Sequence, residues 1–197
     1  MEQLTGQRAI NDIINMYQNT KASLLTAPAL FTMIGVHHGY ILTPSEIGKF
    51  VERLKETKQL QVNLEDPSKT YLVGAILSGL VQRSYEEGHN NFIIPCEGTR
   101  ISSASTYAGA CTCVECTQKN RGVLKVVYKG NVGDWFAWGS HGCDLTVEGD
   151  VGTDACSYIQ DCNVTILGNV GDRFGMDARN SEFTVGSVKS VQNKTEK

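Results

Sequence analysis

The sequence predicts an α+β fold in which an N-terminal helical region is followed by a short right-handed parallel β-solenoid of about three 19-residue coils. Three observations support this prediction. The first ninety residues have apolar positions at helical spacing, a stretch rich in Gly, Ser, Thr and Cys follows, and residues 130–186 form three tandem repeats. We therefore divide the chain into a mainly helical domain (1–90), a Cys/Gly/Ser-rich transition segment (91–122), the solenoid repeats (123–188) and a polar tail (189–197).

Three helices are predicted in the first domain. Ile10, Ile13, Ile14 and Tyr17 fall on one face of the first helix. The second helix begins at Thr43-Pro44-Ser45-Glu46, which offers a capping hydroxyl, a proline at the first helical position and a glutamate that can reach back to the cap. The third helix follows Asp66-Pro67-Ser68 and ends around Gly88.

Two strands are predicted before the repeats. Phe92-Ile93-Ile94 is an apolar run typical of a buried strand, and residues 123–128 form a second strand that leads into the first repeat. The periodicity therefore changes from helical to β between these two segments.

Each repeat opens with Gly-(Asn/Asp)-Val-Gly, beginning at Gly130, Gly149 and Gly168. Each closes with a segment in which polar and apolar residues alternate, as in a half-buried strand: residues 144–147, 163–166 and 182–185. The first and third units are identical at eight of 19 positions. A unit this short cannot bury its own apolar side chains, so equivalent positions must stack on those of the next coil.

Stacking at this spacing predicts three inward ladders and one outward row. The inward ladders are Leu145, Val164 and Phe183; Val147, Ile166 and Val185; and Val132, Val151 and Val170; the outward row is Thr146, Thr165 and Thr184. The stacked Cys143 and Cys162 fit a core ladder of small hydrophobic residues, and the alternative is a metal or redox site. The acidic corners Asp134 and Asp172 suggest calcium, but Thr153 interrupts them in the middle coil.

The repeat motifs also carry a family resemblance. Gly-Asn-Val-Gly-Asp at 130–134 and 168–172, with Gly-Asp-Val-Gly-Thr at 149–153, resembles the Gly-x-Gly-x-Gly (GXGXG-type) β-helix domain that occurs at the C-terminus of the large chain of glutamate synthase and in one of the subunits of formylmethanofuran dehydrogenase. The resemblance covers about a third of the chain and implies a scaffold that packs against catalytic domains or subunits. This chain has three clear coils where the family has more, and its N-terminal half contains no glutaminase, flavin-binding or molybdopterin-related motif.

Charge and hydropathy favour a soluble, cytoplasmic protein with neither nucleic acid nor a membrane as partner. Residues 130–197 hold ten acidic and five basic residues, so this half should repel phosphate backbones. The N-terminus lacks the basic start and apolar run of a signal peptide, and the longest apolar stretch, 22–36, contains Pro28 and is too short to span a bilayer.

Two clusters could carry chemistry. Cys111, Cys113 and Cys116 lie within six residues, and with Cys96 as a fourth ligand they could hold zinc or part of an iron–sulfur cluster; the alternative is reduced thiols buried at the junction of the two halves. The adjacent His37 and His38 suit a loop of ordinary histidines better than a pair of ligands or acid–base groups, because no carboxylate motif accompanies them.

These observations favour a non-catalytic structural or assembly protein whose solenoid packs against itself or a partner subunit. An open solenoid end has unpaired strand edges and apolar ladders, so we expect a homo-oligomer or a protein complex through that end. The alternatives are a Cys-ligated zinc or Fe–S accessory or redox protein, and an enzyme with a site between the two halves.

Overall fold

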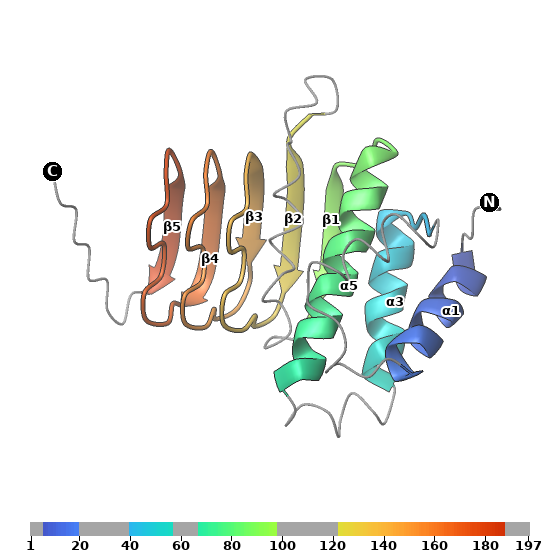
Figure 1. Ribbon diagram of the computed structural model, residues 1–197. Helices are drawn as coiled ribbons and strands as arrows, with labels where there is room; N and C mark the ends of the chain where they lie inside the picture. The colour runs from blue at the N-terminus through green and yellow to red at the C-terminus, as the bar shows by residue number, and fades with distance from the viewer. Residues whose placement is uncertain (1–5, 20–39, 57–66, 98–121, 188–197) are drawn as a thin grey trace, which may run out of the picture.

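The computed structural model describes residues 6–19, 40–56, 67–97 and 122–187 and contains three helices and one five-stranded parallel sheet in these ranges (Figure 1). The helices are α1 (Gly6–Asn19), α3 (Pro44–Glu56) and α5 (Pro67–Glu86). The strands are β1 (Asn91–Pro95), β2 (Leu124–Lys129), β3 (Cys143–Val147), β4 (Asn163–Asn169) and β5 (Glu182–Ser187). Their order in the sheet follows the chain from β1 to β5, so the architecture is a parallel β-solenoid of about three turns accompanied by helices.

Helix α3 begins where the sequence predicts it. Glu46 Oε2 accepts hydrogen bonds from the backbone N–H and the Oγ1 hydroxyl of Thr43, both at 2.8 Å, which is the reciprocal contact of a capping box. The first helical hydrogen bond runs from Ile47 N to the Thr43 carbonyl at 3.0 Å. The buried face of the helix consists of Ile47, Phe50, Val51 and Leu54. None of the helices in the described ranges is long and apolar enough to cross a membrane.

The predicted register of the coils is confirmed. From β2 to β5, paired residues are separated by 19 positions up to Ile166 and Val185, so Leu145 pairs with Val164 and Val164 with Phe183; the register then shifts, and Asn169 pairs with Ser187. The same spacing stacks Val147 on Ile166 and Ile166 on Val185. The threonine row Thr146, Thr165 and Thr184 also pairs in register, and Val132, Val151 and Val170 are buried as the third ladder.

Two of the repeat glycines are required because consecutive coils approach each other closely. A Cβ added at Gly149 would lie 2.6 Å from the carbonyl carbon of Gly130, and one added at Gly168 would lie 2.6 Å from that of Gly149. These distances are below any van der Waals contact. The first position of the repeat therefore stays glycine so that each coil can rest directly on the preceding one.

Strand β1 lies in the segment that the sequence identifies as a transition, and it is the first strand of the sheet. It pairs in parallel with β2, with Phe92 opposite Val126 and Ile94 opposite Tyr128. These two residues of β1 are buried, but Ile93 is 54% exposed. The prediction of a strand was right, and the prediction that Ile93 is buried with its neighbours was wrong because successive side chains of a strand point to opposite faces.

The helices lie at the β1 end of the stack. Helix α3 is beyond β1 on the side away from β2, and the coils of β3, β4 and β5 continue in the opposite direction (Figure 1). The two backbones are close at Gly48, where an added Cβ would lie 3.7 Å from the Ile93 carbonyl oxygen. Tyr85 of α5 donates a 2.9 Å hydrogen bond to the Gly122 carbonyl, just before β2. One end of the sheet is thus covered by helices.

Candidate functional site

The opposite end of the sheet is the β5 edge, and among the described residues no strand or helix lies beyond it (Figure 1). An edge strand presents backbone N–H and C=O groups that can pair with another chain, and proteins protect such edges with prolines, lysines or bulges. Strand β5 contains no proline or lysine, and its one charged residue is Glu182 at its first position. Two of the usual protections against pairing, proline and lysine, are thus absent from β5, and the one irregularity is a register shift in its pairing with β4 between Ile166 and Asn169.

The core ladders also reach solvent at this end. Leu145, in an inner coil, is 1% exposed, whereas Phe183 at the same repeat position is 36% exposed. Phe136 is fully buried, whereas its counterpart Phe174 is only partly buried. The rings of Phe174 and Phe183 meet edge to face with centroids 5.0 Å apart. The apolar surface consists of Phe174, Met176, Ala178, Phe183 and Val185, which we call the open end.

Charged residues of both signs surround the open end. The exposed carboxylates are Asp172, Asp177 and Glu182, and the exposed guanidinium groups are Arg173 and Arg179. Arg173 also forms an ion pair with Asp154 of the preceding coil. A surface with an apolar centre and a rim of mixed charge has the composition of a protein–protein contact.

The sequence pattern predicts only part of this surface. Phe183 and Val185 were expected as the last members of their ladders, but Phe174, Met176 and Ala178 were not singled out. The signal was available, because Phe174 aligns with Phe136 at a spacing of two repeats. An apolar residue that recurs between the corner glycines faces the interior of the coil, and in the last coil it has no further coil to cover it.

Cys96 is the one member of the predicted metal set within the described residues. It directly follows β1, where its N–H donates to the Lys129 carbonyl at 2.7 Å, and its side chain is buried. Burial raises the pKa of this thiol to about 12, although the nearby Lys55 acts in the opposite direction. A neutral thiol packed in the core is its favoured state in the absence of a metal.

The other predicted ligands, Cys111, Cys113 and Cys116, lie outside the described residues, as do His37 and His38. Within the described ranges, no three His, Cys, Asp or Glu side chains are placed to hold a metal ion. The zinc or Fe–S site therefore stays a prediction.

Cys143 and Cys162 are stacked, buried and unoxidised, with their sulfur atoms 3.4 Å apart. Their side chains occupy the same inward position of adjacent coils, as the sequence indicates. The hydrogen bond with Cys143 lowers the pKa of the Cys162 thiol. Both side chains fill the core at a position that Leu124 occupies in β2.

Two aspartates, the acidic corner Asp134 and Asp150, connect consecutive coils. Asp134 Oδ1 accepts a 2.7 Å hydrogen bond from the Thr153 backbone N–H, and Asp150 Oδ1 accepts one of the same length from Asn169 N–H. Each carboxylate thus satisfies a backbone donor of the next coil. This contact gives Asp134 a structural role, whereas Asp172 lies in the last coil; calcium at the acidic corners stays a hypothesis.

Comparison of the chain with protein-family models, curated proteins and solved structures gave no match. Its function is therefore inferred from the two ends of the solenoid and from its surface.

Proposed function

We propose that this chain is a non-catalytic structural protein that assembles through the open end, with β5 of one copy pairing antiparallel to β5 of a second copy. The observation that carries the proposal is the difference in exposure between equivalent ladder positions: Leu145 is enclosed, whereas Phe183 is 36% exposed in an edge strand that has neither proline nor lysine. Covering the apolar residues of the open end gains free energy at about 25 cal/mol per Å² of surface removed from water.

The second copy is favoured over other partners by symmetry and charge. Two-fold rotation brings an edge strand against itself in antiparallel orientation, which forms a regular ladder. Such an interface must be complementary to itself, and the rim offers Arg173 and Arg179 for pairing with carboxylates of the other copy. A rim of one sign would instead repel its own copy.

The resemblance to the Gly-x-Gly-x-Gly β-helix domain supports a scaffold role, because that domain packs against other domains or subunits. In this proposal the coils wind in the right-handed sense usual for parallel β crossovers, and the protein acts in the cytoplasm.

Light scattering over a range of protein concentrations tests the proposal. We expect the native chain to form a dimer and Phe183→Glu to remain a monomer, because the two-fold axis would bring two carboxylates together in an apolar contact. Ile93→Glu is the matched control, since Ile93 is an exposed apolar residue at the covered end. It should dimerise like the native chain.

Circular dichroism must first show that both variants fold. A native chain that stays monomeric at all concentrations contradicts the proposal, and so does a folded Phe183→Glu variant that dimerises as well as Ile93→Glu.

A further inference from the structure

Three stacked turns form a second, rigid surface of the solenoid, distinct from the sheet. Residues 134–139, 153–158 and 172–177 are the turns of successive coils. Backbone hydrogen bonds join them: Trp135 N–H donates to the Thr153 carbonyl and Asp154 N–H to the Asp172 carbonyl, each at 2.8 Å. We call this surface the turn face. Its side chains are held at fixed positions relative to one another because the turns are bonded coil to coil.

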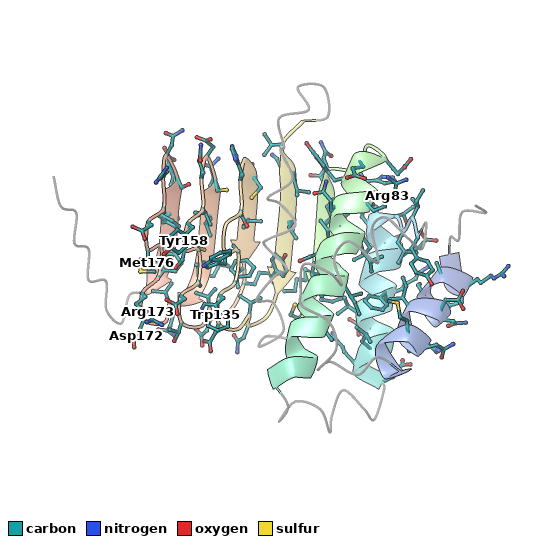
Figure 2. The ribbon with its side chains drawn as sticks, in the orientation of Figure 1. Arg83, Trp135, Tyr158, Asp172, Arg173 and Met176 are labelled. Carbon is teal, nitrogen blue, oxygen red and sulfur yellow. The ribbon has the colours of Figure 1, made fainter. Side chains whose placement is uncertain are left out.

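The turn face concentrates exposed aromatic and apolar side chains. Both tryptophans of the chain belong to it, and Trp135, Trp138, Tyr158 and Met176 are between 39% and 49% exposed. The rings of Trp138 and Tyr158, from adjacent coils, have centroids 5.5 Å apart. Figure 2 shows Trp135, Tyr158 and Met176 on the same side of the coils. Aromatic rings gathered on one exposed surface usually mark a site of interaction.

One of these rings is fixed in orientation. Trp135 Nε1–H donates a 2.9 Å hydrogen bond to Asp154 Oδ2, and the Arg173 guanidinium binds the same oxygen atom. The three residues occupy the same repeat position in consecutive coils, so this contact crosses the whole turn face. A ring that is already immobilised loses little conformational entropy when a ligand stacks on it.

The charge of the turn face is strongly negative. The three turns contain four carboxylates, namely Asp134, Asp154, Asp172 and Asp177, and one guanidinium, Arg173. Such a field attracts cations and repels phosphate backbones. A neutral sugar can also stack on aromatic rings, but it would gain nothing from the charge.

We propose that the turn face binds the cationic side chains of a basic peptide segment in another protein. Guanidinium and ammonium groups are attracted to the faces of Trp138 and Tyr158, while Asp172 and Asp177 supply opposite charges on the neighbouring coil. The chemistry that fits this surface is thus cationic and organic, and arginine fits best because its planar group also stacks on rings. The turn face shares Asp172, Met176 and Asp177 with the open end and its rim, whereas Trp138 and Tyr158 belong to the inner coils.

Intrinsic fluorescence reports on this site directly, because both tryptophans of the chain lie on the turn face. We expect titration of the full chain with a hexa-arginine peptide to give a saturable change in emission that weakens as salt is raised, since salt screens exposed charges. Hexaglutamate and a neutral glucan hexasaccharide should give no saturable change.

Two variants localise the binding. Tyr158→Asn removes a ring at a position with φ of 58°, which asparagine tolerates well, and should weaken hexa-arginine binding about two- to five-fold. Asp177→Asn removes a charge at a position with φ of 54°, which asparagine also tolerates, and should likewise weaken hexa-arginine binding. Leu167→Ala is the matched control, because Leu167 is an exposed apolar residue of β4 outside the turns. It should bind like the native chain.

Phe183→Glu separates this site from the proposed assembly function. It should lose dimerisation, which leaves the shared Asp172, Met176 and Asp177 uncovered, so hexa-arginine should bind at least as well as to the native chain. The inference is overturned if hexa-arginine gives no saturable change, if folded Tyr158→Asn and Asp177→Asn bind as well as Leu167→Ala, or if the glucan binds in place of the peptide.

Discussion

The two ends of this solenoid have the same core pattern but different surroundings. At one end Phe92 and Ile94 of β1 continue the ladders and are buried, with α3 lying beyond the strand (Figure 1). At the other end Phe183 and Val185 of β5 continue the same ladders, and both are only partly covered. A stacked core therefore needs a different covering element at each end. A helix completes it at β1, and we propose that a second copy does so at β5.

The largest effect should follow from removing the cover at the β1 end. Phe50 of α3 is fully buried, so Phe50→Ala should lower the free energy of unfolding by about 3–5 kcal/mol through lost burial and a cavity. Denaturant unfolding followed by circular dichroism measures this loss. Lys49→Ala, an exposed neighbour in α3, should change stability by less than about 0.5 kcal/mol. A similar small loss for Phe50→Ala would mean that α3 does not stabilise this end.

The next prediction compares two members of the same ladder, Leu145 in an inner coil and Phe183 in the last coil. Leu145→Ala should cost about 2–5 kcal/mol because this side chain is enclosed by coils on both sides. Phe183→Ala should cost about 1 kcal/mol in dilute solution, since more than a third of Phe183 is in contact with water in the single chain. Unfolding experiments at low and high protein concentration measure both. At high concentration the loss in free energy of unfolding for Phe183→Ala should grow, because the dimer covers this side chain. Equal losses for the two variants in dilute solution would mean that Phe183 is as well covered as Leu145 in the single chain.

The smallest effect concerns the start of the covering helix. Thr43→Ala removes the hydroxyl of the capping box and should lower stability by about 1 kcal/mol, without changing the oligomeric state. Thermal unfolding and light scattering of the same sample measure the two quantities. A change of oligomeric state in this variant would mean that the β1 end takes part in assembly.

The strand register of the repeats could be predicted because it follows from the constant length of the repeat. A period of 19 residues places Leu145, Val164 and Phe183 in one row for any conformation of the connecting turns, and the structure has this pairing. The capping box of α3 could be predicted for a similar reason, since Thr43 and Glu46 interact within one turn of helix.

Other features, such as the β1–β2 pairing and the turn face, could not be predicted because they depend on contacts between residues that no local sequence pattern relates. The pairing of β1 with β2 joins residues 34 positions apart, such as Phe92 and Val126, and this spacing differs from the repeat. The turn face was not predicted either, because Trp135 and Arg173, which both donate hydrogen bonds to Asp154, are different residue types at equivalent repeat positions. The metal and histidine predictions concern residues outside the described ranges, except for the buried Cys96.

Amide hydrogen exchange of the native chain at several protein concentrations shows directly whether β5 pairs with a second copy. We expect the amides of Glu182–Ser187 to gain protection as concentration rises, because β5 pairs with its counterpart in a second copy, while those of Asn91–Pro95 stay unchanged. Exchange in β5 that is independent of concentration, or a concentration-dependent change confined to β1, would contradict this pairing.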